Sequence, residues 1–162
     1  MRLFKRVLFL FVTVALLFSF LSCSKDSEVH SYLELHIPLG EDFYLTEDKN
    51  FDAVYSNGEY VAAILRISFV AAIKEGIPET MTPYEFGKFW IEKCQRSADI
   101  KYDEVAYCEY NDSTSGEDYF YLEAFFRSQY AYFVVLFATA SEMEDAGRVK
   151  FLSWAKDVYF TD

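Results

Sequence analysis

Residues 131–139 read Ala131-Tyr132-Phe133-Val134-Val135-Leu136-Phe137-Ala138-Thr139 and contain no charged side chain. In an extended chain, alternate residues point to opposite faces of a sheet, and here both sets are apolar. A strand of this kind is covered on both faces, so the pattern predicts a central strand. Helices must therefore pack on each side of it.

Five further runs around this strand have the composition and period of strands. The run at 59–72 is apolar on both faces for most of the length between residues 60 and 70, so it too should be central. A loop over 111–118 is expected between the last two of these runs. The five runs are residues 32–37, 51–56, 59–72, 101–110 and 119–127.

Asn57-Gly58 lies between two of these runs, and this pair favours a tight hairpin. The pair is typical of a turn with positive φ at both central positions, because Asn and Gly adopt that conformation most readily. Residues 51–56 and 59–72 are therefore expected to pair as antiparallel neighbours.

Two capping boxes predict the helices. Thr82-Pro83-Tyr84-Glu85 combines an N-cap threonine, a proline at the first helical position and a glutamate three residues after the cap. Ser141-Glu142-Met143-Glu144 has a similar pattern, and helical spacing follows it to the C-terminus. Together with the doubly covered strands, these helices predict an α+β fold, an α/β/α sandwich around a mainly antiparallel sheet.

This arrangement resembles the PsbP-like family, whose fold is shared by extrinsic photosystem proteins, Mog-type Ran-binding proteins and bacterial lipoproteins of the DcrB type. The resemblance covers residues 32–160 and implies a non-enzymatic binding or assembly module. It places no functional residue of the family at a matched position. It is carried by Tyr130-Ala131-Tyr132-Phe133-Val134-Val135-Leu136-Phe137 and by the closing helix Phe151-Leu152-Ser153-Trp154-Ala155-Lys156-Asp157-Val158-Tyr159-Phe160.

The N-terminal residues have the pattern of a lipoprotein signal peptide. Three basic residues precede an uncharged run, 7–21, which is shorter than the roughly 20 apolar residues of a membrane-spanning helix. Phe20-Leu21-Ser22-Cys23 resembles a relaxed lipobox, in which Ser22 and Cys23 fit and the two residues before them depart from the usual pattern. The alternative is an ordinary signal peptide with an incidental cysteine.

We expect cleavage before Cys23 and acylation of its thiol, which would anchor the protein stably to a membrane. Residues 1–22 would be the signal peptide, 23–31 a lipidated tether and 32–162 a single domain. Ser24, in place of aspartate, follows the cysteine, which by the common sorting rule favours the outer membrane of the cell envelope.

The charge of the expected mature chain excludes one class of partner. Loss of the three basic residues of the signal peptide leaves 12 basic and 26 acidic side chains, a net charge of −14. Nucleic-acid binding needs Lys and Arg to replace the counterions of phosphate, so we expect no nucleic-acid partner.

The sequence contains no nucleophile elbow, phosphate-binding loop or zinc-protease motif. We therefore expect no catalytic residue and no cofactor, and a non-enzymatic binding or accessory module for another envelope protein. The alternative is a small-ligand or ion-binding lipoprotein. Tyr119 and Tyr121, which share a face with Glu123 and Arg127, are candidates for a partner surface.

Residues 48–59 have an incomplete calcium-loop pattern. Asp48, Asn50, Asp52 and Glu59 stand at ligand positions of an EF-hand loop, but Ala53 replaces the glycine that the sharp turn requires. We therefore expect no metal site there.

The remaining candidate site residues are two histidines and two cysteines. His30, in the tether, and His36, on the exposed face of the first strand, have no second ligand at a metal spacing, so we expect both to be solvated. Cys94 and Cys108 remain after acylation of Cys23. They form either a disulfide, which an exported location permits, or two separate buried thiols.

Overall fold

The computed structural model of the chain describes residues 29–114 and 116–161. The expected signal peptide and Cys23 lie outside these residues. Within them, no helix combines the length and the apolar composition that a membrane span needs.

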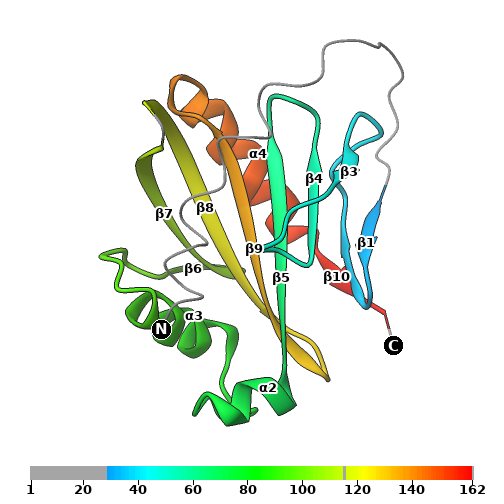
Figure 1. Ribbon diagram of the computed structural model, residues 1–162, viewed down its shortest axis with the longest axis vertical. Coiled ribbons are helices and arrows are strands. Elements are labelled where there is room, and N and C mark those ends of the chain that lie inside the picture. Colours follow the sequence, from blue (N-terminus) through cyan, green and yellow to red (C-terminus); the bar gives the residue numbers. More distant parts are fainter. Residues whose placement is uncertain (1–28, 115, 162) are drawn as a thin grey trace.

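A seven-stranded sheet forms the centre of the molecule (Figure 1), and each pair of neighbouring strands is antiparallel. The strand predicted over 131–139 lies in the middle of it, which confirms the prediction of a central strand. In spatial order the strands are β3 (Tyr44–Thr46), β4 (Ala53–Ser56), β5 (Val61–Ser68), β9 (Ala131–Ala140), β8 (Glu117–Arg127), β7 (Val105–Thr114) and β6 (Lys101–Asp103).

Helices cover both faces of this sheet, so the predicted α+β sandwich is confirmed. One face packs against helices α2 (Phe69–Lys74) and α3 (Pro83–Lys93). The other face packs against α4 (Glu144–Lys156) and a small antiparallel sheet of β1 (His30–Tyr32), β2 (Leu35–Ile37) and β10 (Tyr159–Phe160). In Figure 1, α4 lies behind the large sheet, and α2 and α3 lie toward its lower end.

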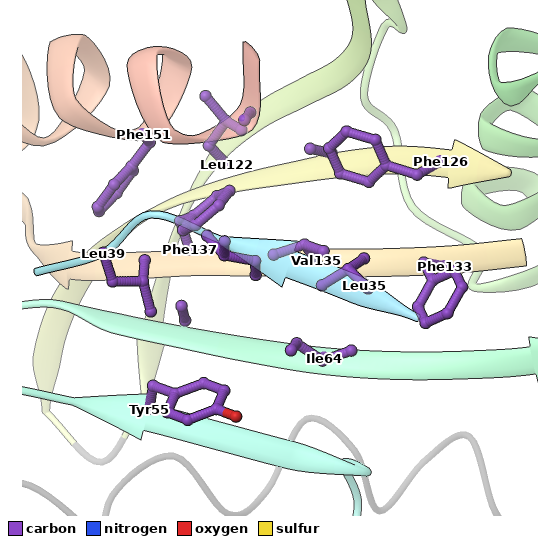
Figure 2. Close-up of a cluster of buried hydrophobic side chains, with 14 of the residues drawn as sticks. Leu35, Leu39, Tyr55, Ile64, Leu122, Phe126, Phe133, Val135, Phe137 and Phe151 are labelled. Atoms are coloured by element: carbon purple, nitrogen blue, oxygen red, sulfur yellow. The ribbon is translucent and has the colours of Figure 1, made fainter. Parts of the chain in front are cut away.

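The larger core lies between the sheet and α4. Figure 2 shows Phe151 of α4 and Leu35 of β2 directed toward the same layer, which contains Val135 and Phe137 of β9. The rings of Phe137 and Phe151 stack with centroids 5.4 Å apart. The odd-numbered residues of β9 thus face α4, as the alternation predicts.

On the opposite face, α3 approaches the sheet closely. Phe86 stacks on Tyr132 of β9 with centroids 4.4 Å apart. Gly87 lies so near the sheet that an added Cβ would be 2.7 Å from the ring of Phe125. The helix therefore packs Phe86, Trp90 and Ile91 against the strands, and Gly87 permits the close approach.

The first capping box is confirmed and the second is wrong. Thr82 accepts a hydrogen bond from the Glu85 backbone N–H, and the Glu85 carboxylate accepts one from the Thr82 backbone N–H. Ser141 instead begins a 3-10 turn, η1 (Ser141–Met143), and α4 starts at Glu144 without a side-chain cap. That helix also ends before Phe160, because the chain turns back to form β10 beside β2.

Backbone turns divide two of the predicted strands, and a helix cap shortens a third. Leu33, with φ of 52°, separates β1 from β2, and Glu104, with φ of 63°, separates β6 from β7. The run at 59–72 ends at Ser68, whose side chain caps α2 by accepting a hydrogen bond from Ala71 N–H. Single residues that change the backbone direction leave the apolar period intact, so the period did not reveal them.

Other boundaries also differ from the prediction. β7 and β8 extend far into the expected loop, so the hairpin between them is shorter than residues 111–118. The edge strand β3 was not predicted. Its residues are largely exposed and carry no clear alternation.

The Asn57-Gly58 hairpin joins β4 and β5 as expected, but its turn differs from the prediction. Gly58 has a positive φ of 87°, whereas Asn57 does not. The Asn57 side chain instead accepts hydrogen bonds from the backbone N–H groups of Glu59 and Tyr60. The asparagine therefore stabilises the turn through its side-chain oxygen and does not adopt a left-handed backbone.

Candidate functional site

The face of the sheet that carries α3 has a second half built from strands. A cluster there consists of side chains from β4, β5, β7, β8 and β9 and from the loop before β4, and none of its described members belongs to a helix. We call this cluster the tyrosine face. It contains Tyr110, Tyr119, Tyr121, Val54, Val61, Ala63, Leu136, Ala138 and Phe51.

Three tyrosines from neighbouring strands form one edge of this face. Tyr121 of β8 stacks on Tyr110 of β7 with centroids 5.1 Å apart and an interplanar angle of 19°. The ring centroid of Tyr119 lies 6.2 Å from that of Tyr121. Tyr121 is buried, whereas Tyr110 and Tyr119 are half-buried, so the aromatic edge remains partly accessible.

An ion pair between half-buried Arg96 and buried Glu123 borders the tyrosine face on the side toward α3. Arg96, just beyond the end of α3, donates to Glu123 of β8 at 2.6 Å and to the hydroxyl of Tyr110 at 2.8 Å. The guanidinium also lies over the Tyr110 ring, 4.9 Å from its centroid. These contacts connect the end of α3 to the tyrosines.

The electrostatics of this pair depend on its burial. The Glu123 residue is 3% exposed, and burial raises the pKa of its carboxyl above the usual range, although Arg96 acts in the opposite direction. Burial acts to lower the pKa of Arg96, but the attraction of Glu123 and Tyr110 outweighs it and raises that pKa. Burial also raises the pKa of Tyr110. Arg96 therefore stays charged and holds Glu123 in place.

A cavity of about 570 Å³ opens at the other border of the tyrosine face. Its apolar lining includes Val61, Tyr119 and Ala138. Three carboxylates also line it, those of Asp48, Glu59 and Glu142, and none of the described lining residues is basic. The site thus combines aromatic rings, an apolar floor and a negative rim.

The structure brings together the two tyrosines that the sequence indicated and separates Arg127, which was expected on the same face, from them. Tyr119 and Tyr121 lie together, and Glu123 on the same strand is buried next to them. Arg127 lies at the far end of β8, where it donates to the backbone carbonyl of Glu79 and covers the ring of Phe69. It therefore takes no part in this site.

Sequence reasoning missed Arg96, Tyr110 and the acidic cavity. One signal was present: Glu123 is the single charged residue in the apolar run of residues 120–126. A carboxylate at such a position requires a cationic or hydrogen-bonding partner. That partner comes from a loop 27 residues away in the chain.

The two cysteines lie in the same layer. Cys108 is buried and Cys94 packs against the same core cluster, as the shared apolar faces suggested. Both are free thiols in the structure, so the disulfide alternative is not formed there. Burial raises the pKa of Cys94 to about 11 and also raises that of Cys108, so both thiols are held in the unreactive protonated form.

The residues of the calcium-loop pattern have separate hydrogen bonds. Asp48 accepts from the backbone and side chain of Asn50, and Asp52 accepts from the backbone N–H of Arg66. In the described part of the chain, no three His, Cys, Asp or Glu side chains are grouped closely enough to hold a metal ion. Residues 48–59 therefore form a loop and a hairpin.

The expectation that both histidines are solvated was wrong. His30 belongs to β1, not to a tether, and its Nε2 lies 2.7 Å from the carbonyl oxygen of Gly40. His36 stacks on Tyr159 and makes hydrogen bonds with Ser31 and Thr161. His30 thus connects β1 to the loop after β2, and His36 connects β2 to β1 and β10.

A second cavity, of about 630 Å³, lies at the β6 edge of the sheet. It is lined mainly by apolar side chains from the start of α3, the end of α4 and β8. Its basic residue, Lys156, is paired with Asp103 at 2.9 Å. Because none of the lining residues that the structure describes is a buried polar group, the tyrosine face is the stronger candidate site.

Comparison with known proteins identifies structural neighbours and no family. No protein-family model matches the chain, and no curated protein matches it. A crystal structure from Bacteroides thetaiotaomicron is similar over 79% of this chain, with a TM-score of 0.51 and 11% identity. This chain spans 45% of that longer chain, so the likeness concerns the fold of one part of it.

Two further solved structures are similar at a lower level. Cyanobacterial PsbP from Synechocystis matches 86% of this chain and 98% of its own, with a TM-score of 0.46 and 13% identity. LpqN of Mycobacterium tuberculosis, described as involved in cell envelope biogenesis, matches 79% of this chain and 83% of its own, with a TM-score of 0.43 and 8% identity. A protein of the PsbP type is thus among the structures that this chain resembles.

Proposed function

We propose that this chain is an envelope lipoprotein, anchored to a membrane through acylated Cys23, whose domain is a non-enzymatic binding or accessory module for another envelope protein. The anchor follows from the basic N-terminal residues, the uncharged run and Ser22-Cys23. Serine, in place of aspartate, directly after Cys23 favours the outer membrane as the location.

The observation that carries the binding role is the tyrosine face. Tyrosine supplies a large contact area with few rotatable bonds and is enriched at protein interfaces. Here Tyr110 and Tyr119 are half-buried, and Tyr119 lines the cavity. The Arg96–Glu123 ion pair holds Tyr110 in position. A preorganised aromatic surface of this kind loses little side-chain entropy on binding.

Affinity capture with matched variants tests this proposal. A partner captured from envelope extracts by the wild-type protein should be lost with the Tyr119→Ser, Val61→Ser variant, which changes two half-buried residues of the face. The control is Tyr102→Ser, Val149→Ser, which removes the same two residue types from sites that are 68% and 70% exposed elsewhere. The control should retain the partner.

Equal capture by both variants would contradict the proposed role of the tyrosine face. If a small molecule copurified with the protein and no captured partner depended on the face, the ligand-binding alternative would replace the proposal.

A further inference from the structure

The cavity at the border of the tyrosine face is lined by apolar and acidic side chains. Its floor contains Val61, Ala138 and Met143, and the ring of Tyr119 lines one side. At about 570 Å³ it lies within the range of roughly 300–1,000 Å³ that is usual for ligand pockets. It is large enough to take a long side chain together with a neighbouring residue.

The carboxylates at its rim are not neutralised by basic side chains of the described residues. Glu59 and Glu142 are exposed, and in residues 29–114 and 116–161 neither carboxylate has an ion-pair partner. Asp48 accepts two hydrogen bonds from Asn50, which is neutral, and has no ion-pair partner within the described ranges. By contrast, Lys93, Arg96 and Lys156 are each paired with a carboxylate elsewhere. The cavity is therefore an apolar groove with an unneutralised negative rim.

We propose that this groove binds a lysine or arginine side chain, presented beside an apolar residue on a peptide segment of the partner protein. This inference rests on the proposed function and specifies its partner. The long apolar stem of Lys or Arg would lie on Val61 and Ala138, while the charged head would meet Glu59 and Glu142. The face of Tyr119 adds a cation–π contact.

The charge of the chain favours this occupant over two others. A second copy of the protein would bring a net charge of −14 in its expected mature form toward an acidic rim, so like charges would oppose self-association. An anionic headgroup or phosphate is opposed by the same rim. A basic segment is attracted by both the rim and the overall field.

The binding test uses the full chain, produced from the complete gene and purified in mild detergent. The probe is the capped hexapeptide Gly-Leu-Arg-Phe-Lys-Gly amide, and its neutral analogue has Gln in place of both basic residues. Calorimetry at low salt should give binding of the basic peptide that is about tenfold tighter than that of the neutral one.

A matched pair of variants separates the groove from the general field. The variant Asp48→Asn, Glu59→Gln, Glu142→Gln should lose about tenfold in affinity for the basic peptide. The control Glu92→Gln, Asp99→Asn, Asp157→Asn removes the same charge from exposed sites outside the groove and should stay within about twofold of the wild type. If the triple groove variant fails to fold, Glu59→Gln, Glu142→Gln at the two exposed positions replaces it.

Three results would overturn the inference: equal losses in the groove and control variants, equal binding of the neutral peptide, or binding of spermidine as tight as that of the basic peptide. The first would indicate bulk attraction, and the last a small-molecule cation site. If the peptides fail to bind while the Tyr119→Ser, Val61→Ser variant still loses its partner, the proposed function stands and the cationic occupant is wrong.

Discussion

At the scale of single residues, Arg96 and Glu123 determine how the tyrosine face is held. Removal of one member of a buried ion pair leaves the other without compensation, and this usually costs more than the pair contributes. Arg96→Ala should therefore lower the free energy of unfolding by about 3 kcal/mol, measured by urea denaturation at neutral pH. The double variant Arg96→Leu, Glu123→Leu should recover much of this loss.

The same variant should respond to pH in a defined direction. Burial already raises the pKa of Glu123, and the loss of Arg96 removes the group that opposes this rise. A carboxyl with a raised folded-state pKa contributes most stability below its unfolded pKa and loses it as the pH rises through the folded pKa. The difference in free energy of unfolding between wild type and Arg96→Ala should thus shrink as the pH falls and Glu123 becomes protonated. A deficit that is independent of pH would contradict the role of the ion pair.

Cys94 and Cys108 give a second prediction at this scale. Because burial keeps both thiols protonated, alkylation of the native protein should be slow. Free-thiol counting on the denatured, unreduced Cys23→Ala protein should then give two thiols. A count of zero would mean that the exported protein forms the disulfide and that reduction should lower its melting temperature.

At the scale of helices and strands, the approach of α3 to the sheet depends on Gly87. Alanine in a helix interior normally stabilises by about 1 kcal/mol relative to glycine. Here the added Cβ would lie 2.7 Å from the ring of Phe125, which is fully buried and has little room to move. Gly87→Ala should therefore lower the free energy of unfolding by about 1–3 kcal/mol.

Ser153→Ala is the control for this prediction, because Ser153 is an exposed residue of the other long helix. Its free energy of unfolding should change by less than about 0.5 kcal/mol. If Gly87→Ala stabilised the protein, α3 would have to shift away from the strands more easily than the packing indicates.

The β4–β5 hairpin gives a prediction about metal ions. Asp48 and Asp52 make separate hydrogen bonds with Asn50 and Arg66, so they do not converge on one point. Calcium at about 5 mM should leave the melting temperature unchanged. A rise in melting temperature that Asp48→Ala removes would show that residues 48–59 form a calcium loop.

At the scale of the whole molecule, membrane attachment depends on Cys23. Cys23→Ala should abolish labelling with a radioactive fatty acid and leave the protein soluble or uncleaved, because the acyl chains supply the membrane affinity. Wild-type protein should fractionate with the outer membrane. Unchanged membrane partitioning of the variant would rule out lipidation as the anchor, and recovery in the inner membrane would contradict the Ser24 rule.

The sequence by itself determined the layers of the domain. Apolar residues on both alternating sets in residues 60–70 and 131–139 required cover on two faces, and Thr82-Pro83 marked the start of one helix. It also indicated Tyr119 and Tyr121. These signals are local, since side-chain periodicity and capping depend on residues that are close together along the chain.

Only the tertiary structure decided the composition of the site. The order β5-β9-β8-β7 places Val61, Ala138, Tyr121 and Tyr110 in one row, and the end of α3 brings Arg96 to Glu123. Periodicity specifies which face of a strand is apolar but not which strand lies beside it. A buried charge in turn specifies that a partner is needed but not from which segment it comes. The cavity and its acidic rim exist only because the ends of three distant segments meet there.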